Sequence, residues 1–236
     1  MPPESDTAPP VVLDRRTGPY GEVVLRRHGE LLQIIANGTF LMDTSDGRSE
    51  RLLVRAALAE LTRHDSGPGA SRDAPRLLIG GLGVGFSLAE AAAEPRWGRI
   101  TVVEREEAVI GWHRDSGPLS AISAGALRDA RTEIVHDDLM TYLRTAGDLF
   151  DALCLDVDNG PDWTVTPDNG SLYSPAGLAA CAARLTAGGV LAVWSAQATP
   201  TFDDAMRNAG FTRVRTEEIP VARGVPDVVH FATKPA

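Results

Sequence analysis

The sequence predicts an α/β fold: a seven-stranded, mostly parallel sheet with helices on both faces, preceded by a small N-terminal β-hairpin domain. From residue 76 onward, short apolar runs alternate with segments of helical periodicity, as a parallel sheet requires. The last two apolar runs have no helix between them, so they should pair antiparallel. A turn containing Gly81, Gly83 and Gly85 directly follows the first apolar run.

Each element of the larger domain is predicted from its own pattern. Apolar runs predict strands at 76–80, 100–104, 132–136, 151–156, 189–195, 211–216 and 227–233. Helical spacing of apolar residues predicts helices near 84–94, 105–115, 138–146, 174–186 and 200–209. Five strand–helix units that end in an antiparallel pair are more typical of a methyltransferase-type Rossmann sheet than of the dehydrogenase type.

The chain before residue 71 has a different character. Its start is polar and rich in proline, which predicts a disordered lead-in. Two short strand patterns at 22–27 and 31–35 flank a tight turn, and Asn37-Gly38 marks a second hairpin. Apolar residues at helical spacing predict a helix within 48–63. We therefore divide the chain into a lead-in (1–17), an N-terminal strand and helix region (18–70) and a Rossmann-like domain (71–236).

Composition argues against several classes of partner. A net charge of −9 disfavours nucleic acid and anionic membranes. No apolar run approaches the roughly 20 residues of a membrane helix. Cys154 and Cys181 lie in apolar runs, and the five histidines are scattered without metal-like spacing. We therefore expect a cytoplasmic protein with no metal site and no disulfide.

The turn at Gly81, Gly83 and Gly85 has the form of a nucleoside-binding loop. A strand that leads through such a turn into a helix lets the backbone approach a ligand, and the helix N-terminus offers free N–H groups. The pattern alone is weak, because glycines after a strand also occur in ordinary tight turns. The residues at the following strand ends favour the cofactor-binding interpretation.

Carboxylates stand at the ends of three predicted strands, where an open α/β sheet binds its ligand. Glu104 follows the glycines by about twenty residues and can accept hydrogen bonds from both ribose hydroxyls; the alternative is an acid that stabilises a helix start. Asp137 can reach an adenine amino group, while Asp138 is predicted to cap the next helix. Asp156 can bind the donor and also orient a nucleophile and take its proton.

A turn-rich segment after Asp156 is predicted to shape the acceptor site. The predicted substrate-binding residues in and after it are Asp158, Trp163 and Tyr173. For Asp158 the alternative is an Asx turn formed with Asn159. For the two aromatic residues the alternative is simple packing.

Together these segments resemble the spermidine synthase (polyamine aminopropyltransferase) family, over residues 18–232. Thr101-Val-Val-Glu104 looks like the family's ribose-binding strand, and His136-Asp137 matches its adenine-side aspartate. Leu172-Tyr173-Ser174 and the segment 185–191, LTAGGVL, are close to the family's LYSEEF and LKPGGVL. The resemblance implies an N-terminal β-hairpin domain, an adenosyl donor bound by a methyltransferase-like Rossmann domain, and a homodimer.

Departures from the family pattern concern the charged groups. The family's glycine loop is GGGDGG, whose aspartate resembles a clamp for the primary amine of the donor. Here the loop is Gly80-Gly-Leu-Gly-Val-Gly85, with no carboxylate. The family's DSSDPxGP segment, which holds its catalytic aspartate, is replaced by Asp156-Val-Asp158-Asn-Gly-Pro161, and its YHE segment by Ser49-Glu50.

These departures lead us to expect S-adenosylmethionine as donor and transfer of its methyl group to a small amine or hydroxyl, with Asp156 as the catalytic residue. The alternative is the family's own chemistry, aminopropyl transfer from decarboxylated S-adenosylmethionine to a diamine. A third interpretation is a catalytically degenerate binding protein. A fourth, a nicotinamide oxidoreductase, is disfavoured by the terminal strand pair.

Overall fold

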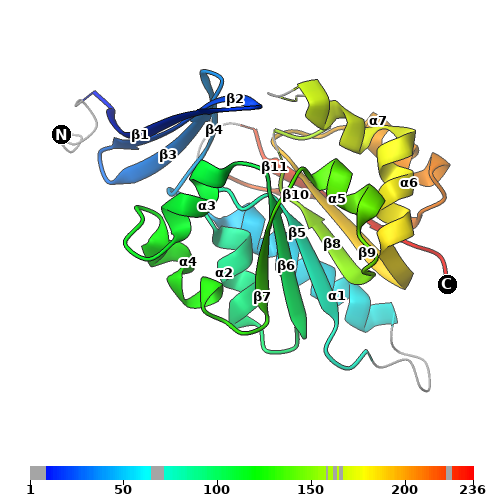
Figure 1. The fold of residues 1–236 in the computed structure, drawn as a ribbon. Coiled ribbons are helices and arrows are strands. Elements are labelled where there is room, and N and C mark those ends of the chain that lie inside the picture. Colours follow the sequence, from blue (N-terminus) through cyan, green and yellow to red (C-terminus); the bar gives the residue numbers. More distant parts are fainter. Residues whose placement is uncertain (1–8, 65–71, 158, 162–163, 165–166, 222–224) are drawn as a thin grey trace.

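The computed structural model describes residues 9–64, 72–157, 159–161, 164, 167–221 and 225–236, which form two sheets and the helices around them (Figure 1). The first sheet is antiparallel, with four strands in the order β1-β2-β3-β4. The second has seven strands in the order β10-β11-β9-β8-β5-β6-β7. The predicted α/β fold class, including the small N-terminal hairpin domain, is confirmed.

The N-terminal sheet is a simple meander of β1 (Val11–Gly18), β2 (Gly21–His28), β3 (Leu31–Ala36) and β4 (Thr39–Asp43). β2 and β3 correspond to the two predicted strands. Asn37 and Gly38 join β3 to β4 with positive φ angles of 50° and 79°. Left-handed conformations at both central residues are what a tight hairpin turn requires, so this second predicted hairpin is also present.

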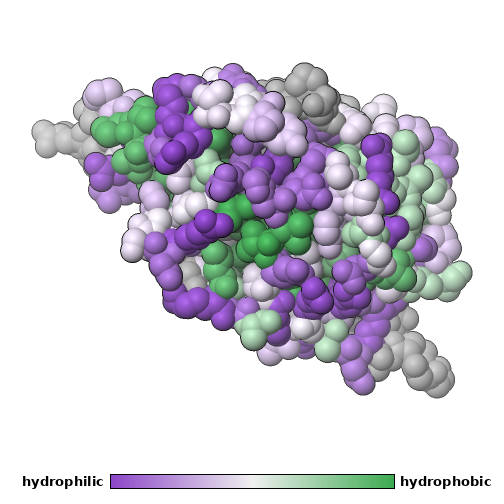
Figure 2. Space-filling model, viewed as in Figure 1, coloured by the Kyte–Doolittle hydropathy of each residue, from purple (hydrophilic) through white to green (hydrophobic). Residues whose placement is uncertain are grey.

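β1 corrects the prediction of a disordered lead-in over 1–17, because residues 11–17 pair with β2. Most of the strand is exposed, so its apolar and polar residues do not alternate, and the sequence pattern does not reveal it. Val11, Val12 and Leu13 are all exposed, and Figure 2 shows hydrophobic side chains gathered at this end of the sheet.

The larger sheet contains β5 (Arg76–Gly80), β6 (Arg99–Glu104), β7 (Thr132–His136), β8 (Phe150–Leu155), β9 (Leu185–Ser195), β10 (Thr212–Ile219) and β11 (Asp227–Thr233). β5 to β9 run parallel to one another. β11 lies between β9 and β10 and pairs antiparallel with both. The predicted antiparallel end of the sheet is therefore confirmed.

Helices cover both faces of this sheet: α1 (Arg48–His64), α2 (Phe86–Ala93), α3 (Glu107–His113), α4 (Ser120–Leu127), α5 (Leu139–Thr145), α6 (Pro175–Arg184) and α7 (Pro200–Asn208). Alternate residues of β8 pack into two hydrophobic cores, one on each face of the sheet. Ala152 and Cys154 pack with the side of α1 and α2, and Leu153 and Leu155 with the side of α5 and α6. The ends of β5, β6 and β8 are thereby fixed from both faces.

The helix predicted near 105–115 corresponds to α3, but the sequence analysis does not predict α4, which follows after a turn near Gly117-Pro118. α1 falls within the predicted N-terminal region 18–70, yet it packs against β8 and β9 of the larger sheet. The first turn of α1 therefore lies beside the strand ends of the Rossmann-like domain.

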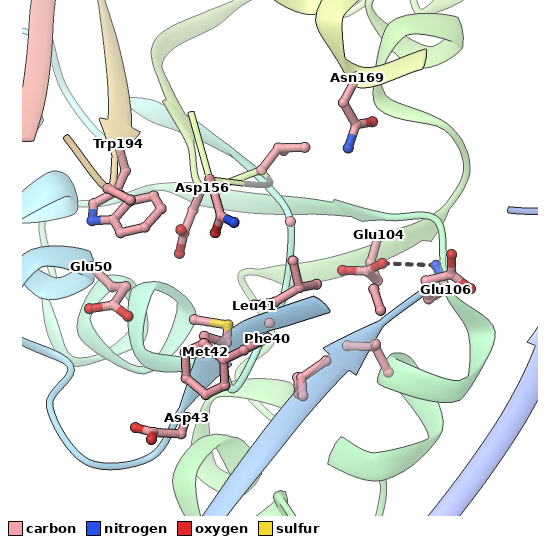
Figure 3. Close-up of a pocket in the computed structure, with 18 of the residues that line it drawn as sticks. Phe40, Leu41, Met42, Asp43, Glu50, Glu104, Glu106, Asp156, Asn169 and Trp194 are labelled. Atoms are coloured by element: carbon pink, nitrogen blue, oxygen red, sulfur yellow. Dashed lines mark hydrogen bonds between the residues drawn. The ribbon is translucent and has the colours of Figure 1, made fainter. Parts of the chain in front are cut away.

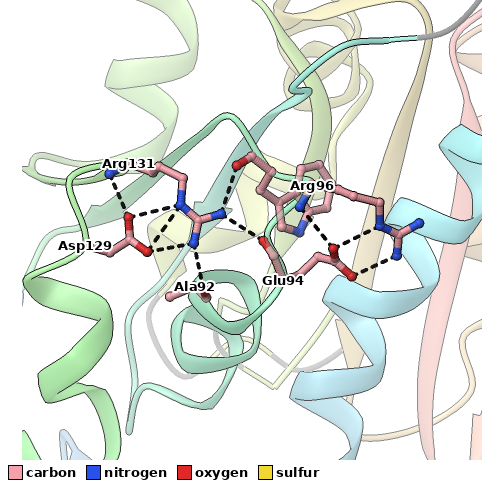
Figure 4. A network of polar contacts seen from close by, with 6 residues as sticks. Ala92, Glu94, Arg96, Asp129 and Arg131 are labelled. Carbon is pink, nitrogen blue, oxygen red and sulfur yellow. Dashed lines mark hydrogen bonds and ion pairs between the residues drawn. The ribbon is translucent and has the colours of Figure 1, made fainter.

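Arg131 fixes the C-terminal end of α2, the helix that follows the glycine turn (Figure 4). Its guanidinium donates to the carbonyl oxygens of Ala92 at 2.6 Å, Glu94 at 2.9 Å and Trp97 at 3.0 Å. Asp129 forms an ion pair with Arg131 at 2.6 Å. The last carbonyls of a helix have no partner within it, so these bonds satisfy groups that would otherwise be left open.

Both cysteines are buried and free. Within the described ranges, no helix has the length and apolar character needed to cross a membrane. The same residues contain no group of three or more His, Cys, Asp or Glu side chains arranged to hold a metal ion.

Candidate functional site

A cavity of about 760 Å³ lies between the N-terminal sheet and the ends of β5, β6, β7 and β8 (Figure 3). Phe40 and Met42 of β4 and Ile34 of β3 contribute to an apolar wall. The described lining residues include one basic residue, Arg105, and nine acidic ones: Asp43, Asp46, Glu50, Glu104, Glu106, Asp137, Asp138, Asp156 and Asp227. A ligand that carries positive charge suits such a lining.

The glycine turn forms the floor of this cavity. Gly81 and Gly83 line it with positive φ angles of 90° and 50°. A Cβ at Gly81 would clash with the carbonyl oxygen of Asp156, so only glycine lets β5 and β8 approach this closely. Gly85, also predicted to bind the cofactor, precedes α2 and is not among the cavity-lining residues.

Glu104 is held rigidly at the end of β6. One carboxylate oxygen accepts a hydrogen bond from the backbone N–H of Leu82 at 2.9 Å, and the other from that of Glu106 at 2.8 Å. The side chain is buried and lines the cavity. Each oxygen retains a lone pair for a ligand hydroxyl, as binding of a ribose diol would need.

Asp137 lines the cavity next to Glu104. Its backbone N–H donates to the carbonyl oxygen of Glu104 at 3.2 Å, and its side chain accepts from the N–H of Asp138 at 2.8 Å. Asp138 caps α5 by accepting from the N–H of Thr141, as the sequence predicted. Glu104 and Asp137 are thus brought together as two adjacent acceptors at one side of the cavity.

Asp156 follows β8 and lies between Glu50 and Glu104 in Figure 3. Its carboxylate accepts a hydrogen bond from the Ser87 hydroxyl at 3.2 Å. Burial raises the pKa of Asp156 to about 6; the Ser87 hydrogen bond opposes this shift, and the charge of Asp227 adds to it. A carboxyl group whose pKa lies near neutrality suits proton transfer.

Glu50 and Asp227 are acidic residues of the cavity that the sequence analysis does not assign to the site. Glu50 lies in the first turn of α1 and is 7% exposed. Burial raises its pKa to about 8, and the nearby charge of Asp156 adds to the shift. Asp227 begins β11, and burial raises its pKa as well.

Ser49 joins these two carboxyl groups. Its hydroxyl oxygen lies 2.5 Å from Oδ2 of Asp227 and 3.2 Å from Oε2 of Glu50. A hydroxyl has one hydrogen, so both contacts are satisfied when Ser49 donates to Asp227 and protonated Glu50 donates to Ser49. The indole N–H of Trp194 also donates to Asp227, at 3.4 Å. Among the described residues, Glu50 and Asp227 therefore hydrogen-bond to neutral groups, Ser49 and Trp194.

Of the three predicted acceptor residues, Tyr173 is the one among the described residues. Asp158 and Trp163 lie outside the described residues. Tyr173 is buried, and its hydroxyl donates to the carbonyl oxygen of Val157 at 2.8 Å. It packs edge-on against Phe202, with ring centroids 5.7 Å apart, and supports the start of the loop rather than lining the cavity.

The sequence of the chain is similar to those of known polyamine aminopropyltransferases. The chain is 32% identical over 214 residues to the polyamine aminopropyltransferase of Mycobacterium tuberculosis, covering 86% of this chain and 37% of the relative. It is 30% identical over 167 residues to polyamine aminopropyltransferase 1 of Streptomyces coelicolor, covering 68% and 28%. Over most of its own length, the chain is therefore similar in sequence to polyamine aminopropyltransferases.

Solved structures show the same spermidine synthase-like fold. A spermidine synthase in complex with the transition state analogue AdoDATO matches with a TM-score of 0.75 at 18% identity, covering 95% of this chain and 74% of that one. The spermidine synthase of Thermotoga maritima matches with a TM-score of 0.73 at 18% identity, covering 95% and 73%. No protein-family model matches the chain. The chain spans 37% or less of the length of the two curated relatives named above.

Proposed function

We propose that this chain acts as an aminopropyltransferase, with decarboxylated S-adenosylmethionine as donor and a diamine as acceptor. The observation that carries the proposal is the cluster of Glu50, Asp156 and Asp227, whose charges act on one another; Figure 3 shows Glu50 and Asp156 at the end of the cavity away from Glu106. These carboxyl groups have neutral hydrogen-bond partners among the described residues. An ammonium group in their midst would gain charge-assisted hydrogen bonds that nothing in the described protein supplies.

The other end of the cavity suits the adenosyl part of the donor. Gly81 and Gly83 allow close approach to the backbone, and Glu104 offers two fixed oxygens to the ribose hydroxyls. Asp137 can accept from the adenine amino group. The cavity volume of about 760 Å³ lies within the usual range for small-ligand sites, about 300–1,000 Å³.

The charge of the cavity favours the decarboxylated donor over S-adenosylmethionine itself. The latter brings a carboxylate, and Arg105 is the basic residue among the described lining residues. Arg105 is already engaged, with Glu106 at 3.5 Å and with Asn169 at 3.0 Å. The decarboxylated donor ends in an ammonium group, which Glu50 can hold from α1 although the glycine loop carries no acid.

The proposed transfer needs a neutral amine on the acceptor. Its lone pair attacks the propyl carbon next to the sulfonium, the C–S bond breaks, and the electron pair returns to sulfur to give methylthioadenosine. Asp156 supplies this neutral amine by taking a proton from the acceptor ammonium, and the product forms as a secondary ammonium ion. Much of the rate enhancement comes from holding amine and carbon in line inside the cavity, with the carboxylate contributing as a general base.

The direct test is incubation of the chain with decarboxylated S-adenosylmethionine and putrescine, followed by detection of methylthioadenosine. We expect product from the wild type and at least a hundredfold less from Asp156→Asn. Absence of methylthioadenosine with a panel of diamines, under conditions where the donor binds, would contradict aminopropyl transfer and favour the interpretation as a binding protein.

Methyl transfer from S-adenosylmethionine is a second candidate, favoured by one observation. Gly83, in a loop without a carboxylate, faces Met42, whose sulfur occupies the space a side chain at position 83 would need. This part of the wall is therefore apolar. The two candidates give different products, because methyl transfer yields S-adenosylhomocysteine and aminopropyl transfer yields methylthioadenosine. Mass spectrometry after incubation with each donor separates them.

A further inference from the structure

The glycine turn is held by a buried histidine that does not line the cavity. His113, the last residue of α3, is 1% exposed, and its Nε2 lies 2.8 Å from the carbonyl oxygen of Gly83. Its Nδ1 lies 2.6 Å from the hydroxyl oxygen of Ser123 in α4, which is 0% exposed. Neither residue lines the cavity. Two hydrogen bonds thus connect Ser123 of α4, through His113 of α3, to the glycine turn.

These contacts define the state of the imidazole ring. A carbonyl oxygen only accepts, so Nε2 carries a hydrogen and donates it to Gly83. Burial lowers the pKa of His113, which favours the neutral ring. Nδ1 is then unprotonated and accepts from the Ser123 hydroxyl. One neutral tautomer, with its hydrogen on Nε2, satisfies both bonds.

Gly85 makes room for this ring. A Cβ at Gly85 would lie 2.8 Å from Cε1 of His113 and 3.2 Å from Cβ of Ser123. Its φ of 94° is also one that other residues rarely adopt. The third glycine of the turn therefore serves the contact behind the loop, which explains why it does not line the cavity.

The other bonds of the turn come from its own backbone and from β6. The N–H of Gly81 donates to Val103, and that of Leu82 donates to Glu104. His113 hydrogen-bonds to the carbonyl oxygen of Gly83. Gly83 also lines the cavity and faces Met42. A shift of Gly83 toward or away from His113 therefore moves the cavity floor directly.

We propose that His113, as a neutral imidazole fixed by Ser123, is a positioning residue for the adenosyl donor: it holds Gly83 and thereby keeps the glycine turn in its ligand-binding shape. The inference rests on the proposed function, which assigns the donor to this turn. His113 itself touches no substrate. Its effect should appear in donor affinity rather than in the transfer step.

The test compares His113→Leu, which removes the donor to Gly83, with His113→Gln, whose amide N–H can still reach it. The probe is 5′-methylthioadenosine, which contains the nucleoside but no ammonium group. By calorimetry we expect about tenfold weaker binding for His113→Leu and at most about threefold for His113→Gln, as loss of one hydrogen bond to a buried carbonyl implies. In turnover, KM for the donor should rise while kcat and the acceptor KM stay within about threefold.

A matched control is His230→Leu. His230 is also 1% exposed, but it lies in β11, hydrogen-bonds Asp203 and does not line the cavity. The His230→Leu substitution should lower the melting temperature without weakening 5′-methylthioadenosine binding. Equal binding by wild type and folded His113→Leu would overturn the proposal.

A second measurement uses the wild type alone and so does not depend on a variant that folds. ¹⁵N NMR of the imidazole should show the neutral ring with hydrogen on Nε2, unchanged between pH 5.5 and 8. A ring that titrates in that range, or one protonated on Nδ1, would overturn the proposal. If the wild type fails to bind 5′-methylthioadenosine at all, the proposed function fails with it, an outcome distinct from equal binding by wild type and variant.

Discussion

Glu50 and Asp156 are two carboxyl groups in one cavity without a basic partner among the described residues. Removal from water favours the neutral form of each, and the charge of Asp156 further raises the pKa of Glu50. Near neutral pH the pair is expected to retain one proton, mostly on Glu50. Binding of an ammonium group would reverse this preference, because a positive charge favours both ionised forms.

Asp156→Asn should abolish turnover while leaving the nucleoside site intact. Asparagine has nearly the same shape, and the backbone that packs against Gly81 is unchanged. We expect kcat to fall by about 10²–10⁴, the usual contribution of a positioned base, with 5′-methylthioadenosine affinity within about twofold. Steady-state kinetics and calorimetry check the two parts. Full activity of the variant would remove Asp156 from the mechanism.

Glu50→Gln should make the stability of the protein less dependent on pH. The pKa of Glu50 is about 8 when folded, against about 4.3 in an unfolded chain. Between these values the folded state binds more protons, so the free energy of unfolding falls as pH rises toward 8. Glutamine removes this loss, and the variant should be more stable than the wild type at pH 8.5 by roughly 1–3 kcal/mol.

Urea unfolding at pH 6.5 and pH 8.5 measures that difference. The variant and the wild type should differ less at pH 6.5, where Glu50 still holds its proton. An equal difference at both values would mean that the pKa of Glu50 is not raised.

At the scale of elements, the sequence predicts those parts of the site that end on parallel strands. The glycine turn, Glu104, Asp137 and Asp156 each follow a strand with a clear apolar pattern, and parallel strands meet at one edge. Glu50 and Asp227 could not be assigned in this way. They come from a helix start and an antiparallel strand far apart in the chain, and only the packing of α1 against the sheet brings them to Asp156.

Arg131 is predicted to be the main side-chain support of α2. Its three hydrogen bonds to carbonyls in and just after the last turn of α2 have no replacement in Arg131→Ala. The free energy of unfolding should fall by about 1–3 kcal/mol, as for other partly buried carbonyls left without a donor. Arg96→Ala is the control, because the exposed Arg96 side chain pairs with Glu94 at the surface, and the substitution should cost less than about 0.5 kcal/mol. Equal losses in urea unfolding would contradict this role.

At the scale of the whole molecule, the protein carries a net charge of −9, and nine of the described residues that line its cavity are acidic. The electric field of these negative charges attracts a dication such as putrescine. Salt reduces the range of this attraction, because the Debye length falls from about 10 Å at 0.1 M to about 3 Å at 1 M. We therefore expect KM for putrescine to rise several-fold between 0.05 and 0.5 M NaCl. The affinity for uncharged 5′-methylthioadenosine should change little, and a parallel loss of both would contradict an electrostatic origin.

Both the acidic end of the cavity and its nucleoside end bear on a single question, the identity of the donor. Calorimetric titration of the wild-type chain with decarboxylated S-adenosylmethionine and with S-adenosylmethionine, at pH 7.5 and the same salt concentration, answers it most directly. We expect at least tenfold tighter binding of the decarboxylated donor, because its ammonium group meets Glu50 and Asp156 and it brings no carboxylate. Equal or tighter binding of S-adenosylmethionine would contradict the proposed donor.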